Sequence, residues 1–359
     1  MSAAPARILS DVPAATLEWL LEPDNPAVAV LTRRTLLGEP SDDAETAALW
    51  ARRNEHPPIA GILDAQLADG AWDVPSRDYQ KYGGSLWQVH FLGELWADRD
   101  DQRVRRAADY AFSRQLADGS WSVSNMQPRG SIQCLTANVA RALARLGWAR
   151  DERIARAIAY VVDVQRDRGP LVCAGGYGEF TLNGYCHMLA PKLLLLLGEV
   201  PRDAWPEGAE EVRGAAVEAL RDKQVFRCLP NGSRDYLDLA YAARKSDLRA
   251  VRAKWLAEHS PLEYKEKPGW LKFGFPLSYN SDALEALWAL TRVGETPRAE
   301  YAPATELVRK SADAQMRWAL RNTLNGKMRA DVEQKGAPSK WLTLRALQVL
   351  AWTEGDGGR

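Results

Sequence analysis

The sequence contains little of several features that mark whole classes of protein. Only 6 of its 359 residues are Phe and only 4 are Cys. Four cysteines in a chain of this length do not suggest a disulfide scaffold, so we expect free thiols and a cytoplasmic location. The longest apolar stretch, Leu193 to Gly198, is far shorter than the ~20 residues needed to cross a membrane. The first residues lack a basic segment followed by a long apolar run, so we expect no signal peptide.

Neither sign of charge is in excess, because Lys+Arg and Asp+Glu are both 47. A neutral chain has no long-range field that favours nucleic acid or an anionic membrane surface, so we expect neither partner. Phosphate-binding glycine loops, GxSxG and HExxH motifs are missing as well. Alternating β-branched residues are almost absent, which predicts an all-α protein. Tryptophan is abundant instead, with 14 residues, and needs a structural or ligand-binding explanation.

One phrase of seven residues occurs twice in the chain. QLADGAW runs from Gln66 to Trp72 and QLADGSW from Gln115 to Trp121. A third, incomplete copy from Gln165 to Leu171 has Leu in place of Trp. Each copy follows the last by about fifty residues, a period typical of stacked supersecondary units.

Each unit is predicted to contain two helices. The amphipathic helices end in the repeated phrase, and the apolar ones end in Gly, the usual helix-stop residue. We expect apolar inner helices at 26–37, 83–97, 131–146, 181–197, 278–293 and 338–352. Their outer partners are expected at 12–22, 43–66, 101–116, 151–165, 207–222 and 303–321.

The last inner segment is as apolar as those in the middle of the chain. An open solenoid needs polar end caps, so this pattern favours closure of the six pairs into a ring. We therefore predict a single (α/α)6 toroid over residues 1–359. Residues 229–274 are charged and aromatic and interrupt the period, so we expect a surface excursion that could act as a lid over the cavity mouth.

The second phrase resembles the QW motif of the terpenoid cyclases. In RAADYAFSRQLADGSW the matching residues are Arg106, Tyr110, Gln115, Gly119 and Trp121. The first phrase fits less fully, since its aromatic residue is missing. The resemblance is strong over residues 60–150. It implies an α/α toroid in which such phrases fasten outer helices together, away from substrate.

The carboxy-terminal half is similar to small bacterial squalene-cyclase-like proteins with one toroid, in the stretches FGFPLSYNSDALEAL and GAPSKWLTLRAL. The resemblance implies an isoprenoid or other apolar substrate in a central, aromatic-lined cavity. It also implies acid-initiated cyclisation or rearrangement, which is isomerase or lyase chemistry. Such a reaction needs a buried carboxyl group that stays protonated.

Two groups of acids are candidates for this proton donor. The string Asp98-Arg99-Asp100-Asp101 matches the DxDD pattern of those cyclases, but it lies between two helices, where aspartates commonly cap a helix. Asp282 is the better candidate, because it opens an inner helix and Glu285 one turn later would raise its pKa. The alternative for Asp282 is also a helix cap.

Polar and aromatic side chains at the starts of the inner helices would face one cavity if the ring closes. A few polar groups among aromatic walls are typical of small-molecule sites, and aromatic faces stabilise cations. The alternative for each aromatic side chain is core packing. The candidate substrate-binding residues are Tyr82, Gln133, Asn183, Tyr185, His187, Tyr279, Lys340 and Trp341.

A zinc site is a competing hypothesis, as in the protein prenyltransferases that share the toroid. Cys173, Cys186 and Cys228, with His187, are suitable zinc ligands. Adjacent residues 186 and 187 would point ~100° apart on a regular helix, however, and a free Cys commonly acts as a small apolar residue. A third hypothesis is a non-catalytic toroid that binds an apolar ligand. Zinc is the only cofactor considered, and the sequence does not decide the oligomeric state.

Overall fold

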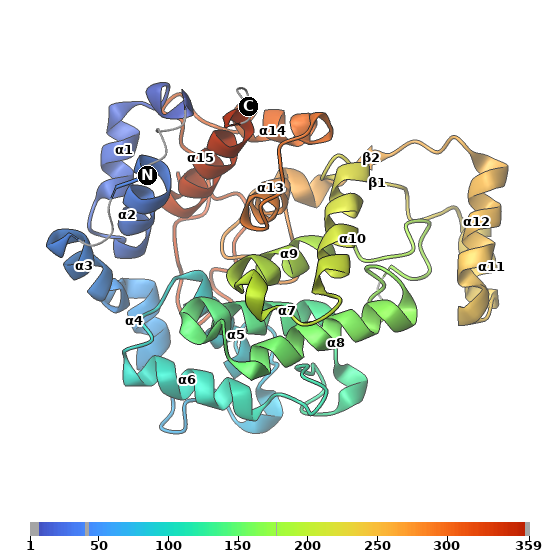
Figure 1. Ribbon diagram of the computed structural model, residues 1–359, viewed down its shortest axis with the longest axis horizontal. Coiled ribbons are helices and arrows are strands. Elements are labelled where there is room, and N and C mark those ends of the chain that lie inside the picture. Colours follow the sequence, from blue (N-terminus) through green and yellow to red (C-terminus); the bar gives the residue numbers. More distant parts are fainter. Residues whose placement is uncertain (1–6, 40–42, 177, 356–359) are drawn as a thin grey trace.

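The computed structural model describes residues 7–39, 43–176 and 178–355, and helices dominate these segments (Figure 1). Within them, the only named strands are β1 (Arg227–Cys228) and β2 (Lys265–Glu266), which pair antiparallel. The all-α prediction is confirmed. No described helix combines the length and apolar character that a membrane span requires.

Six helices correspond to the predicted inner set. They are α2 (Pro26–Thr32), α5 (Ser85–Glu94), α7 (Gln133–Leu143), α9 (Leu189–Glu199), α13 (Ala283–Arg292) and α15 (Lys340–Glu354). π-helical turns extend α2 over Arg33–Leu37 and α7 over Ala144–Trp148. The outer helices are α1 (Ala14–Leu21), α3 (Ala44–Ala51), α4 (Pro57–Asp64), α6 (Gln102–Ser113), α8 (Glu152–Arg168), α10 (Ala209–Asp222) and α14 (Ala302–Lys310). Short 3-10 turns lie at Arg7–Ser10, Arg53–Glu55, Pro75–Arg77, Pro128–Gly130, Arg202–Ala204, Lys245–Asp247, Pro268–Leu271 and Ala299–Tyr301.

The inner helices contact one another in chain order. Contacts run from α5 to α7, α9, α13 and α15, and α15 also contacts α1 and α2. Outer helices α6, α8, α10 and α14 pack on the preceding inner helices α5, α7, α9 and α13, one unit earlier than the predicted pairing, and within the described residues only α14 also contacts its predicted partner α15 closely. The first and last helices therefore lie side by side, as Figure 1 shows for α1, α2 and α15.

Three predicted helices have different bounds in the structure. The segment 181–197 is helical only from Leu189, because Gly184 has a positive φ of 73° that a regular helix does not contain. The segment 43–66 is divided into α3 and α4, since Pro57 opens a new helix. The segment 303–321 stops being helical at Lys310, beyond which Ala312 pairs with Trp318 in a β-bridge.

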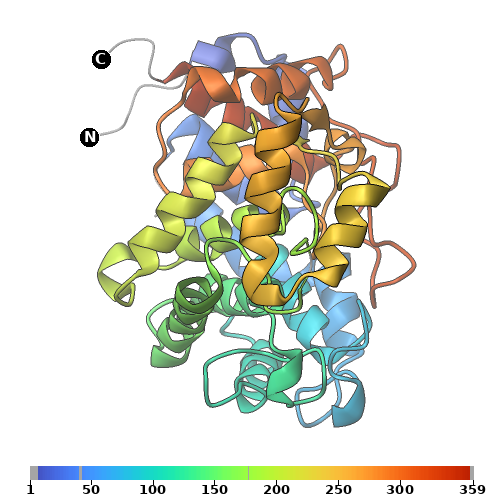
Figure 2. The same ribbon diagram turned by 90° about the vertical axis from the view of Figure 1, so that its right-hand side faces the viewer.

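The predicted insertion contains α11 (Arg234–Ala242) and α12 (Leu248–His259). We call residues 227–266 the arm. Figure 2 shows its two helices in front of the rest of the chain, on one side of the molecule. The arm has a small apolar cluster of its own around Tyr236, which also includes Leu182 and is separate from the main core. Its role as a lid stays a prediction.

The repeated phrases join neighbouring outer helices through their glutamines. The Gln115 Nε2 group donates to the carbonyl oxygen of Gly119 and to that of Arg153 in α8, both at 2.8 Å. Gln66 makes the equivalent pair of bonds, at 3.2 and 2.9 Å, the longer within its own turn and the shorter to α6. Each glutamine thus satisfies carbonyl groups on two successive units.

The tryptophan of each phrase links an outer helix to the next inner one. Trp121 donates from Nε1 to the carbonyl oxygen of Ala111 at 2.8 Å, and its backbone N–H donates to the Thr136 hydroxyl of α7 at 3.1 Å. Trp72 and Trp318 have the same two kinds of bond. Trp318 is not recognisable as part of the repeat, because the glutamine and glycine of the phrase do not precede it at the same spacing.

A buried ion cluster joins four inner helices. Glu94 of α5 lies 2.6 Å from an Arg141 nitrogen of α7 and 2.8 Å from an Arg345 nitrogen of α15. Arg145 lies 3.7 Å from Glu94 and also pairs with Glu199 of α9. Because Arg345 is far along the chain from Glu94, the cluster ties the last inner helix to an early one.

Residues 273–282 run between the inner helices, and we call them the strap. The His90 Nε2 atom of α5 hydrogen-bonds with the carbonyl oxygen of Leu277 at 2.8 Å. Asn138 of α7 donates to the carbonyl oxygen of Ser278 at 3.1 Å. The strap is thus held against both α5 and α7 by its backbone carbonyl groups.

Replacing Gln115 with Ala should lower the free energy of unfolding by about 1–2 kcal/mol, because two partly buried hydrogen bonds are lost. Urea denaturation measures the change. Gln165→Ala is the matched control, since Gln165 occupies the same repeat position and its Nε2 atom has no hydrogen-bond partner among the described residues. Equal losses in the two variants would contradict the proposed fastening role.

Candidate functional site

A pocket of about 360 Å³ opens where the segments before four inner helices meet. Its lining includes residues just before or at the start of α5, α7, α9 and α13, namely Tyr79, Lys81, Ile132, Cys134, Cys186, Met188, Tyr279 and Asn280. We call it the cysteine pocket, because three of the four cysteines line it: Cys134, Cys173 and Cys186. Of the eight predicted substrate-binding residues, Tyr279 alone lines this pocket.

The cysteine pocket is apolar inside and cationic at its edge. Burial raises the pKa of the Cys134 thiol and of the Tyr279 hydroxyl, so both groups stay protonated at neutral pH. The exposed Lys81 ammonium lies 5.3 Å from the ring centroid of Tyr82 and 5.6 Å from that of Tyr279. Arg129 is exposed and also lines the pocket. The pocket therefore suits an apolar ligand with one polar or anionic end.

The Gln133 side chain supports the wall of this pocket by hydrogen bonds to backbone groups of the loop at residues 172–174. Its Nε2 atom donates to the carbonyl oxygen of Val172 at 2.8 Å, and its Oε1 atom accepts from the Ala174 N–H at 2.9 Å. These two bonds hold the loop that carries Cys173. Gln133 is thus a positioning residue for the pocket wall and does not itself line the pocket.

Three predicted substrate-binding residues, Asn183, Tyr185 and His187, lie in the loop before α9, on the side of the molecule where the arm is. Asn183 hydrogen-bonds with both backbone groups of Leu229, each at 3.0 Å. Tyr185 lines a different cleft, and its ring contacts that of His187 with centroids 5.1 Å apart. Burial, followed by the charge of Lys267, lowers the pKa of His187 to about 3, so its imidazole is neutral.

Two other predicted residues hold α15 in place. Lys340 forms ion pairs with Glu22 at 2.8 Å and with Asp24. Trp341 is 2% exposed and stacks on Phe275 of the strap, with ring centroids 4.7 Å apart. The contacts of Trp341 fit the core-packing alternative, and those of Lys340 are ion pairs to the first helices of the chain.

Asp282 is buried and caps α13. Its Oδ1 atom accepts from the Glu285 N–H at 2.7 Å and its Oδ2 atom from the Gly274 N–H at 2.8 Å. Burial, and then repulsion by Glu285, raise the pKa of Asp282 to about 7. Glu285 itself accepts from the Lys192 ammonium at 2.6 and 2.7 Å. Asp282 thus lies two residues after Asn280, which lines the cysteine pocket, but Asp282 does not line the pocket itself.

The DxDD string forms the predicted cap between two helices. Asp101 is the N-cap of α6 and accepts from the Arg103 N–H at 2.8 Å. Asp98 forms an ion pair with Arg53 at 2.9 Å. Neither acid lines the cysteine pocket.

The cysteines proposed as zinc ligands are divided between two places in the structure. Cys173 and Cys186 share the pocket with Cys134, whereas Cys228 lies in β1 outside it. Among the described residues, no three His, Cys, Asp or Glu side chains are arranged to hold a metal ion. The sequence analysis missed Cys134, although its place at the start of an inner helix resembles that of Cys186.

Comparisons with known proteins give only distant structural matches. No family model and no curated protein matches the sequence. A protein from Actinoplanes has 17% identity and a TM-score of 0.34, over 86% of this chain and 99% of the other. Type II terpene cyclase MstE from Scytonema, without ligand, has 14% identity and a TM-score of 0.33, over 82% and 95%. An MstE variant in complex with merosterolic acid A has 15% identity and a TM-score of 0.34, over 82% and 94%. Scores this low carry no argument about the site.

The raised pKa of Asp282 predicts a specific pH dependence of stability. An Asp with a pKa of about 7 when folded and near 3.9 when unfolded binds more protons in the folded state between these values. The free energy of unfolding should therefore fall as pH rises from 4 to 7, by up to about 1.4 kcal/mol per unit of pKa difference. Asp282→Asn should remove this part of the slope in urea titrations. Asp100→Asn, at an exposed position, should leave it unchanged, and an unaltered slope in Asp282→Asn would contradict the assignment.

Proposed function

We propose that the chain is an (α/α)6 toroid that binds a small, mainly apolar molecule of isoprenoid type in the cysteine pocket. The observation that carries this proposal is the convergence of four inner-helix starts on one pocket lined by apolar and sulfur-containing side chains. The sequential contacts of the inner helices and the Glu94–Arg345 ion pair support a closed ring. Pockets with such walls and few polar groups commonly hold small molecules.

The edge of the pocket suggests the orientation of the ligand. Lys81 and Arg129 are cations on exposed positions, while Ile132 and Met188 are partly buried. An apolar tail would contact Ile132 and Met188, since apolar surface gains free energy when it leaves water. A carboxylate or another anionic end would lie near the two cations at the rim.

Acid-initiated conversion of this ligand is a second candidate function. Its support is the Asp282 carboxyl, because a group with a pKa of about 7 is partly protonated at neutral pH. Proton transfer to an alkene carbon would leave the Asp282 carboxylate and a carbocation, which the carboxylate could deprotonate after rearrangement. Both Asp282 oxygens accept bonds from backbone N–H groups, so this reaction requires the strap to move.

Farnesol and farnesoic acid are suitable probes of the binding proposal. Both should bind saturably in isothermal titration calorimetry, the acid more tightly than the alcohol. Cys134→Phe should weaken both by tenfold or more, about 1.4 kcal/mol, because the new ring fills part of the pocket. Lys81→Ala should weaken only the acid.

Cys228→Phe is the matched control for the pocket substitution, since Cys228 lies in β1 outside the pocket. It should bind both probes as the unaltered protein does. Absence of saturable binding, or equal effects of the two phenylalanine variants, would refute the proposal.

The second candidate makes a separate prediction. If Asp282 donates the proton, incubation with farnesoic acid yields a cyclised or isomerised product, and Asp282→Asn abolishes its formation while farnesoic acid still binds. Product analysis by mass spectrometry and chromatography measures this. Turnover that continues in Asp282→Asn would exclude Asp282 as the donor, and binding without turnover would support a purely binding role.

A further inference from the structure

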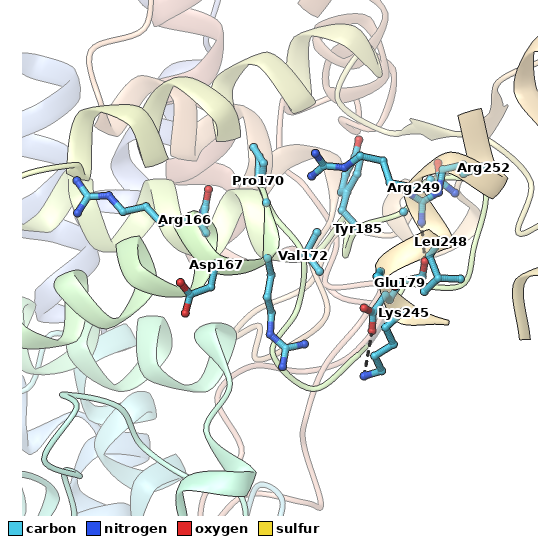
Figure 3. Close-up of a pocket in the computed structure, with 16 residues that line it drawn as sticks. Arg166, Asp167, Pro170, Val172, Glu179, Tyr185, Lys245, Leu248, Arg249 and Arg252 are labelled. Carbon is cyan, nitrogen blue, oxygen red and sulfur yellow. Dashed lines mark hydrogen bonds and ion pairs between the residues drawn. The ribbon is translucent and has the colours of Figure 1, made fainter. Parts of the chain in front are cut away.

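A second cavity, of about 960 Å³, lies between the end of α8 and the arm. Figure 3 shows Arg166 and Asp167 on the α8 side and Lys245, Arg249 and Arg252 on the side of the arm. It has no lining residue in common with the cysteine pocket. We call it the basic cleft.

The basic cleft concentrates positive charge in a chain that is neutral overall. Five basic side chains line it, Arg166, Arg168, Lys245, Arg249 and Arg252, against the acids Asp167 and Glu179. Glu179 lies 3.6 Å from the Lys245 ammonium. Apart from this pair, four arginines and one acid, Asp167, line the cleft. The excess of positive charge favours an anionic ligand.

Arg252 has a structural role that fixes the floor of the cleft. Its guanidinium donates to the carbonyl oxygens of Glu179 at 2.6 Å and Thr181 at 3.1 Å. It lies directly against Gly184, where an added Cβ atom would be 2.2 Å from the Arg252 Nη1 atom. Arg252 thereby fastens the arm to the loop before α9.

Arg249 reaches across the cleft without such a role. A Cβ atom at Gly169, just after α8, would lie 2.7 Å from the Arg249 Nη2 atom. In the described part of the chain, no hydrogen bond or ion pair engages the side chain of Arg249 or of Arg168. Both are exposed, one on each side of the cleft. Fastening of the arm therefore does not explain these two guanidinium groups.

We propose that the basic cleft binds a small molecule that carries two or more phosphate groups. Guanidinium groups match phosphate oxygens in a bidentate geometry, and four of the five basic residues are arginines. The cations come from both α8 and the arm, so a ligand with several phosphates can contact more of them at once than a single phosphate can. This inference is independent of the ligand in the cysteine pocket.

Inorganic pyrophosphate and tripolyphosphate test the proposal on the full chain. At constant ionic strength, calorimetry should show saturable binding that strengthens from orthophosphate to tripolyphosphate. Arg249→Gln and Arg168→Gln should each weaken tripolyphosphate binding about tenfold or more. Farnesol binding should be unaffected in both variants, which separates this test from that of the cysteine pocket.

Arg234→Gln is the matched control. It also removes one arginine from the arm, but Arg234 pairs with Asp238 and does not line the cleft. Its affinity for tripolyphosphate should equal that of the unaltered protein. Equal weakening by Arg234→Gln and Arg249→Gln would show binding to overall charge and overturn the proposal, as would the absence of saturable binding.

Discussion

The buried carboxylate of Glu94 is the group on which the packing of the apolar helices depends. It pairs with Arg141 and Arg345 and so joins α5, α7 and α15. Burial alone would raise the pKa of Glu94, but Arg141, Arg145 and Arg345 lower it overall, so the carboxylate is ionised. An unpaired buried charge costs several kcal/mol. These helices therefore cannot move apart without exposing or isolating the charges.

The same cluster accounts for part of the high tryptophan content. Trp288 of α13 lies with its ring centroid 4.3 Å from the guanidinium carbon of Arg345 and 5.6 Å from that of Arg141. Such contacts stabilise cations that are removed from water. Trp121 and Trp318 connect outer to inner helices through hydrogen bonds. Many of the aromatic rings thus serve the protein's own cations and backbone.

The strap determines where ligands can bind. Its backbone bonds to α5 and α7, and Phe275 stacks on Trp341 of α15, so it is held against these three inner helices. Tyr279 and Asn280 of the strap line the cysteine pocket, whereas the basic cleft lies beside the arm. Asp282 ends the strap, and its carboxyl is both a helix cap and a buried acid. Any reaction at Asp282 would be coupled to movement of the strap.

Local patterns were enough to predict the alternation of apolar and amphipathic helices and the Asp101 cap, because these depend on residues close in sequence or on the repeat itself, and the resemblance to the QW motif implied the fastening role of Gln115. They also indicated that inner-helix starts share a mouth, where Tyr279 lies. They could not place Lys340, whose partners Glu22 and Asp24 lie at the other end of the chain. Nor could they show that the strap is held against α5, α7 and α15 or that the arm forms one side of a basic cleft. Those features depend on contacts between distant segments, whose energies have no periodic signature in the sequence, and only the tertiary structure decides them.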